Sequence, residues 1–383
     1  MRSMSASNDT SPGADGLPRG TGWHADCCPS RRGGPEAREN IIMYSPCPST
    51  ARSLMIVAAS ACALAGNAAA ADAPKAAMLL PGSINDQSWN AIGYSGLMAI
   101  KALGFDVAYT ENTPDSDDAT AMEDYAQHGY SVVLGHSGRF LSAAQRVGPD
   151  YPKVQFIVGG GAAGQSPNVA SIDYDNAAFG CQLGVLAARM SKSGKVGGVY
   201  GLEGLPNIVA QAGGFRLCAK TANPAIQVTI VYVKDMEDAA AAKEAALSLI
   251  ADGADVLTGK LNAAQNGLVQ AAKDKGVYVT GRDPSSVETA PKAVLTNVLE
   301  FWDQMYAKTA AQAKAGHLVS GFVRYGYNTA DQTVGATLAY DKGAKFNPVV
   351  PAAVAAEVDG MGAKFASGAL KIAPTPDDAK GGR

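Results

Sequence analysis

The chain has little of what metal sites and hydrolytic centres need. Only four of its 383 residues are histidines, and nowhere do His and Cys follow the spacing of a metal site. No pair of carboxylates and no Ser-His-Asp order stands out as a catalytic set. We therefore expect no metal, no cofactor and no enzymatic activity.

An excess of positive charge is also missing. The formal net charge is -3, and no run of Lys and Arg forms a basic patch, so a nucleic-acid partner is not expected. Hydrophobic residues make up 47% of the chain. At this length, that fraction is enough for two lobes, each with a core of its own.

The apolar run Leu54–Gly66 is too short to span a membrane. It follows Arg52 and leads into small residues that end at Ala71, which is the pattern of a secretory signal peptide. We predict a signal peptide over 43–71 and a bacterial periplasmic protein. Because the residues before Cys62 make a poor lipoprotein box, lipid anchoring is not expected. Residues 1–42, without hydrophobic periodicity, are read as a mis-assigned or disordered extension.

Two cysteines follow the predicted cleavage site, Cys181 and Cys218. Each lies on a predicted apolar helix, and the two helices are assigned to different lobes. We therefore expect two buried free thiols in preference to a disulfide, despite the oxidising compartment.

Short apolar segments alternate with helical ones along the rest of the chain, which predicts α/β lobes with parallel sheets covered on both faces. Strands are expected near 76–80, 106–110, 131–135, 154–158 and 169–172, and again near 195–200, 226–232, 255–258, 277–280 and 293–297. Helices are expected near 90–103, 118–128, 139–149, 176–191, 207–221, 238–252, 263–275 and 299–315.

The restart of this pattern near Lys195 predicts two doubly wound lobes with a ligand cleft between them. The N-terminal lobe is expected to comprise 75–190 and 295–318, and the C-terminal lobe 193–292 and 319–375. Three hinge crossings are placed near 191–194, 281–293 and 316–321. Ligands of such folds lie at the carboxyl ends of the strands, so the loops that follow the strands are the candidate site.

Polar and aromatic residues in these loops form the candidate ligand site: Asn85, Asp86, Trp89, Asn90, His136, Ser137, Asn207, Met236, Lys260 and Asp283. Other interpretations stay open. Asp86 or Ser88 can cap a helix, Trp89 can pack in the core, and Asp283 can cap a helix or turn. Lys260 and Arg282 either neutralise Asp283 or are solvated.

The loops, in this order, resemble those of the basic membrane protein family of ABC-transporter substrate-binding proteins, which includes purine nucleoside receptors. The resemblance rests on the order and spacing of these segments: Asn85–Asn90, Asp175–Gly184, Lys195–Gly201, Pro206–Ile208, Gly253–Val256, Gly281–Asp283 and Val294–Val298. It implies a type I periplasmic binding fold without catalysis. It also implies first-lobe polar contacts from Asp86 and Asn90, a stacking role for Trp89, and a ribose or base contact for Asp283.

The chain departs from the family at three places. Met236 stands where the family has a stacking Phe, Glu300 stands where it has a Lys, and Gly159-Gly160 lacks a strand-end Asp. Met covers a flat ring but stacks with less directionality. The resemblance implies a purine nucleoside or nucleobase as the ligand. The three departures argue that the nucleoside chemistry is not fully retained, which leaves a free purine base, a modified nucleoside or another small polar heterocycle.

The resemblance implies a monomer that captures its ligand and delivers it to an ABC permease. Two alternatives belong to other classes. One is an exported hydrolase acting on nucleosides, which needs a catalytic set that the sequence does not display. The other is a sensory binding protein that reports to a receptor, and the sequence does not separate this from transport.

Overall fold

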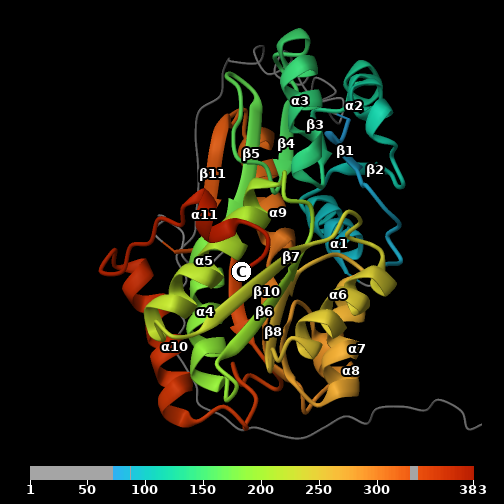
Figure 1. Cartoon of the computed structure of the whole chain (residues 1–383). Coiled ribbons are helices and arrows are strands. Elements are labelled where there is room, and N and C mark those ends of the chain that lie inside the picture. Colours follow the sequence, from blue (N-terminus) through green and yellow to red (C-terminus); the bar gives the residue numbers. More distant parts are fainter. Residues whose placement is uncertain (1–71, 87, 328–334) are drawn as a thin grey trace, which may run out of the picture. The chain divides into compact units, whose positions relative to one another are not determined.

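The computed structural model describes residues 72–86, 88–327 and 335–383 (Figure 1). The predicted extension (1–42) and signal peptide (43–71) lie outside the described residues. Of the described helices, none is long and apolar enough to cross a membrane.

The first sheet contains six strands in the order β11-β5-β4-β3-β1-β2, all parallel. Its strands are β1 (Lys75–Leu79), β2 (Asp106–Thr110), β3 (Val132–Gly135), β4 (Gln155–Gly159), β5 (Val169–Tyr174) and β11 (Gly321–Tyr325). Its helices are α1 (Trp89–Ala102), α2 (Asp118–Gln127), α3 (Leu141–Val147) and α9 (Trp302–Lys314). Short 3₁₀ turns lie at Asp115–Asp117, Gly138–Phe140 and Gly148–Asp150.

Both faces of this sheet are buried, as apolar strands without polar alternation predict. Met78 packs in one hydrophobic cluster with residues of α1 and α9, including Leu97 and Tyr306. Its neighbour Leu79 packs in a second cluster with Met122 of α2 and with residues of α3. Successive residues of a strand therefore face opposite helical layers.

The second sheet has the order β12-β10-β9-β8-β6-β7, with only β12 antiparallel. Its strands are β6 (Lys195–Tyr200), β7 (Gln227–Tyr232), β8 (Val256–Lys260), β9 (Tyr278–Gly281), β10 (Val294–Glu300) and β12 (Ala336–Ala339). Its helices are α4 (Asn176–Met190), α5 (Pro206–Ala222), α6 (Ala239–Ala251), α7 (Gln265–Lys275), α8 (Pro284–Thr289), α10 (Ala352–Ala366) and α11 (Pro376–Ala379). Figure 1 shows α6, α7 and α8 grouped beside this sheet.

The predicted two-lobe architecture is confirmed, but three elements belong to the other lobe. Strand β10 pairs with β9 and β12, so it joins the second sheet rather than the first. Strand β11 pairs with β5, so it joins the first sheet rather than the second. Helix α4 packs against α5 and α10 of the second lobe. The lobe to which such a strand belongs depends on the strand that it pairs with, and the order along the chain does not reveal that partner.

The chain therefore passes between the lobes at other points than predicted. It crosses from β5 to α4, from β10 to α9, and between β11 and β12. The predicted hinges at 191–194, 281–293 and 316–321 each connect two elements of one lobe, so those three positions are wrong.

Helices α4 and α5 pack unusually closely because glycines face the partner backbone. A Cβ on Gly180 would lie 2.1 Å from the carbonyl oxygen of Gln211, and one on Gly214 would lie 2.3 Å from that of Ala177. This approach brings Cys181 and Cys218 together in a disulfide. The prediction of two separate thiols is therefore wrong, because it placed α4 in the wrong lobe.

Candidate functional site

A small cavity, called here the central cavity, lies where loops of both lobes meet at the carboxyl ends of the strands. Its lining residues are Trp89, Ser137, Gly138, Leu205, Asn207, Ile208, Met236, Lys260, Asn262 and Arg282. Five of the ten predicted site residues are thereby brought together: Trp89, Ser137, Asn207, Met236 and Lys260. The volume of about 30 Å³ is far below the roughly 300 Å³ at which pockets for small-molecule ligands begin.

Trp89 begins α1 and forms the aromatic wall of the cavity. Its Nε1 donates to the carbonyl oxygen of His136 at 2.9 Å, and its ring stacks on the His136 ring with centroids 3.9 Å apart. The edge of Trp302 packs against it at 5.1 Å. These contacts fix the plane of the indole, which is only 5% exposed.

His136 was predicted as a ligand donor, but it is fully buried and does not line the cavity. Its Nε2 lies 2.8 Å from the carbonyl oxygen of Trp89, so this nitrogen must carry the proton. Its Nδ1, 2.7 Å from the hydroxyl of Tyr306, therefore accepts. Burial lowers the pKa of His136 to about 3. The residue is a neutral support for Trp89.

Lys260 and Arg282 bring two positive charges to the second-lobe side, and Glu300 joins them. Lys260 Nζ donates to Glu300 Oε1 at 2.8 Å and to the hydroxyl of Tyr174 at 2.6 Å. Arg282 donates to both carboxylate oxygens of Glu300, from Nε to Oε1 at 3.1 Å and from Nη2 to Oε2 at 3.0 Å. The Nε1 of Trp302 also donates to Glu300, at 2.6 Å.

The ionisation of this charge cluster follows from its burial and its pairing. Burial alone would raise the pKa of Glu300, but Arg282 and Lys260 outweigh burial and hold that pKa well below its usual range. Burial lowers the pKa of Lys260, and Glu300 opposes this shift. For Arg282 the attraction of Glu300 exceeds the effect of burial, so its pKa is raised. Glu300 is thus a buried carboxylate shared by two cations.

Arg282 also contacts the aromatic wall. Its guanidinium carbon lies 4.9 Å from the centroid of the Trp89 ring, within the range of a cation–π contact. The His136 ring stacks on the same indole, so Trp89 contacts both an imidazole and a guanidinium. Sequence reasoning had left Arg282 as a neutralising or solvated residue. Its position directly after β9 was the available signal.

Besides His136, four more predicted residues lie outside the central cavity. Asp86 accepts from the backbone nitrogens of Ser88, Asn90 and Ala91 and from the side chain of Asn90. Asn90 in turn accepts from the nitrogen of Gly82. Asp283 caps α8 by accepting from the backbone nitrogen of Ser286, and Asn85 is exposed. Helix capping, the alternative left open by the sequence, describes both Asp86 and Asp283.

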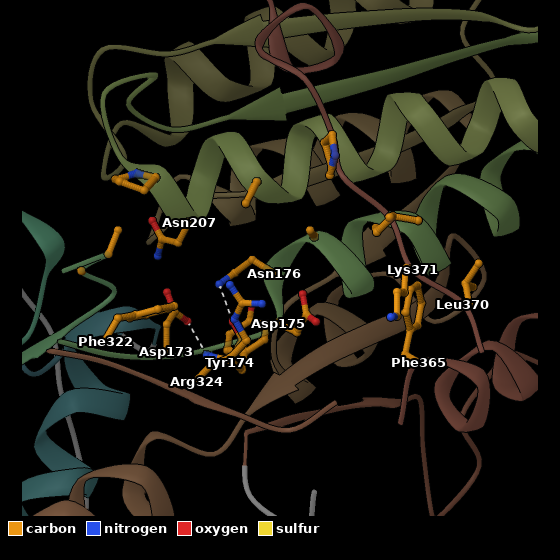
Figure 2. A pocket seen from close by; sticks show the side chains of 17 residues that line it. Asp173, Tyr174, Asp175, Asn176, Asn207, Phe322, Arg324, Phe365, Leu370 and Lys371 are labelled. Carbon is orange, nitrogen blue, oxygen red and sulfur yellow. Dashed lines mark hydrogen bonds between the residues drawn. The ribbon is translucent and has the colours of Figure 1, made fainter. Parts of the chain in front are cut away.

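A larger cavity, called here the side cavity, has a volume of about 580 Å³ and shares Asn207 with the central cavity. Figure 2 shows Asn207 across the side cavity from Asp173 and Arg324. Burial raises the pKa of Asp173 to about 6. The side cavity carries charges of both signs, from Asp173, Asp175, Arg324 and Lys371, whereas the charges lining the central cavity are both positive.

The family model for PnrA-like substrate-binding proteins of ABC transporters matches residues 73–341. The chain belongs to this family. Members are substrate-binding components of transporters and act outside the cytoplasmic membrane, so the chain is a binding protein rather than the exported hydrolase considered above. Among the described residues, no group of three or more His, Cys, Asp or Glu side chains could hold a metal ion.

Two curated relatives illustrate the range of the family. The transcriptional activator protein med of Bacillus subtilis is 30% identical over 257 residues, 67% of this chain and 80% of that protein. A purine-binding protein of Brucella abortus is 26% identical over 214 residues, 55% of this chain and 60% of that protein.

Solved structures confirm the type I periplasmic binding fold. A solute-binding protein from Conexibacter woesei has a TM-score of 0.60 and 25% identity, with 79% of this chain and 99% of that chain covered. One from Aeropyrum pernix has a TM-score of 0.68 at 18% identity, with 79% and 94% covered. The latter likeness concerns the fold alone.

Proposed function

We propose that the protein is exported to the periplasm as a monomer, binds a purine-type ring in the central cavity, and delivers it to an ABC permease. The observation that carries this proposal is the meeting of Trp89 from the first lobe with Met236 and Arg282 from the second lobe around one cavity. The name of the purine-binding relative from Brucella abortus supports the ligand class.

The size of the central cavity suggests how binding proceeds. At about 30 Å³ it holds little more than water, so a ring enters only when the lobes separate. Hinge closure around a ligand is a known behaviour of periplasmic binding proteins. The predicted role of Asp283 at a ribose is not part of this proposal, because its carboxylate caps α8.

A thermal-shift screen of the full chain against purine bases, nucleosides and a general metabolite set tests the proposal. A ligand at a hundredfold excess over its Kd stabilises the folded state by about 2.7 kcal/mol. We expect a raised Tm with at least one purine. A shift produced only by solutes other than purines would contradict the ligand class and leave the binding fold unaffected.

A sensory role is the second candidate, favoured by the relative that is named a transcriptional activator. The two roles differ in what happens to the ligand. Deleting the gene should abolish uptake of labelled ligand if the protein serves transport. If it serves sensing, uptake should persist while the transcriptional response to the ligand is lost.

A further inference from the structure

The ten residues that line the central cavity include two cations and no carboxylate. The nearby carboxylates are engaged elsewhere. Glu300 is enclosed by Lys260, Arg282 and Trp302, and Glu237 accepts from Asn262 at 2.6 Å. A ligand in this cavity therefore faces positive charge.

The uncharged polar groups of the cavity offer donors as well. The side-chain oxygen of Asn207 accepts from the backbone nitrogen of Ile208 at 2.9 Å, which leaves its NH₂ group to donate. The oxygen of Ser137 accepts from the backbone nitrogen of Arg139 at 3.4 Å, and its hydroxyl hydrogen remains available. Lys260 has three N–H bonds, of which Tyr174 and Glu300 engage two.

The charge cluster holds two cations, Lys260 and Arg282, around Glu300, and all three side chains are at most 4% exposed. The buried carboxyl of Asp173 also favours the charged form of Lys260. Neither Glu300 nor Asp173 lines the central cavity, whereas Lys260 and Arg282 both do. An anionic group in the central cavity would therefore meet the two cations of the cluster.

Sugar hydroxyls need acceptors, and the cavity provides few. Asp86 and Asp283, the carboxylates expected from the sequence to hold a nucleoside, are occupied by helix caps. The wall formed by Trp89 and Arg282 suits a planar group, because a guanidinium can lie over a ring and attracts electron-rich ones.

We infer that the ligand is a planar, oxo-rich or anionic ring without a sugar, recognised by Arg282 and Lys260 with Asn207 and Ser137 as further donors. This inference rests on the proposed function and narrows it. Under this inference Arg282 determines specificity, because its positive charge lies beside Trp89 and interacts with the ring of the ligand.

Isothermal titration of the full chain at pH 7 with urate, xanthine, adenine and adenosine tests the inference. Urate is an anion at this pH and carries three oxo groups. We expect urate or xanthine to bind at least about tenfold more tightly than adenosine, a difference of about 1.4 kcal/mol. Tighter binding of adenosine would overturn the inference and leave the proposed function standing. Binding of none of the four would contradict both.

The variant Arg282→Gln should weaken urate binding by about tenfold or more and change adenine binding much less. Lys243→Ala is the matched control, because Lys243 pairs with Asp274 on the surface. Equal losses for urate and adenine in Arg282→Gln would overturn the inference.

A second variant tests the inference even if Arg282→Gln does not fold. Asn207→Asp replaces the donor by a carboxylate in the first turn of α5, where a negative charge suits the helix. It should weaken urate binding and spare or improve adenosine binding. Unchanged preference in this variant would contradict the proposed donor role of Asn207.

Discussion

The two sides of the central cavity are built from different chemistry. The first-lobe side is aromatic and neutral, because Trp89 is held by His136, whose pKa burial lowers to about 3. The second-lobe side is ionic, because Lys260 and Arg282 share Glu300. The first lobe thus supplies a fixed flat wall and the second lobe supplies positive charge, which in the binding mode that we propose selects the ligand.

The largest expected loss of stability comes from a substitution on the ionic side of the cavity. Glu300→Gln removes the carboxylate that Lys260 and Arg282 share as a hydrogen-bonded partner, which should lower the free energy of unfolding by about 3–5 kcal/mol. Urea denaturation measures the loss. Glu357→Gln is the control, because Glu357 pairs with Arg189 with both side chains about two-fifths exposed, and its loss should stay below about 1 kcal/mol. Similar losses in the two variants would contradict a buried charge cluster.

The second effect concerns the helix pair that anchors the ionic lobe. Replacing Cys181 and Cys218 by Ala removes the bond between α4 and α5 and should cost about 2–4 kcal/mol of stability. Because neither residue lines the central cavity, the affinity of the folded variant for its ligand should stay within a few-fold of wild type. Equal stability of the variant and wild type under oxidising conditions would contradict the disulfide.

The smallest expected effect is a change in the pH dependence of stability, and it concerns His136 on the neutral side of the cavity. The unfolded chain protonates His136 near its ordinary pKa of 6.5, whereas the folded chain resists protonation until about pH 3. Stability should therefore fall as pH drops below 6.5, and between pH 7 and 5 this contribution amounts to about 2 kcal/mol. Asp173 opposes this trend: its pKa, raised to about 6, makes its own contribution grow as pH falls from about 6 to 4.

His136→Asn removes the first contribution and leaves that of Asp173. Urea denaturation between pH 5 and 7 should show a smaller decrease in stability on acidification for the variant than for wild type. Parallel pH profiles would show that His136 is not held neutral, and the contrast between the two sides of the cavity would then be lost.

Much of the fold follows from local sequence. Apolar strands such as 131–135 and 154–158 were predicted within a residue or two of β3 and β4, because burial on both faces leaves a continuous hydrophobic run. The lobe assignments of α4, β10 and β11 were missed. These depend on pairing and packing between segments distant in sequence, and the disulfide was missed with them.

Only part of the candidate site could be predicted, because the sequence does not show which groups a polar side chain meets in the fold. Aspartate before a helix suits both capping and ligand binding, so Asp86 and Asp283 were chosen although both cap helices. Trp89 and Lys260, also chosen from the sequence, line the central cavity. The roles of Arg282 and Glu300 required the geometry, because only the folded chain shows which carboxylate each cation meets.

Tryptophan fluorescence tests the central claim most directly, since Trp89 contacts Arg282 and Trp302 donates to Glu300. Titration of the full chain with urate should give a saturable change in emission that is unaltered in Lys243→Ala and needs at least about tenfold more ligand in Arg282→Gln. If thermal shift shows binding while emission stays unchanged, or if Arg282→Gln responds like wild type, the ligand binds away from the central cavity and the account is wrong.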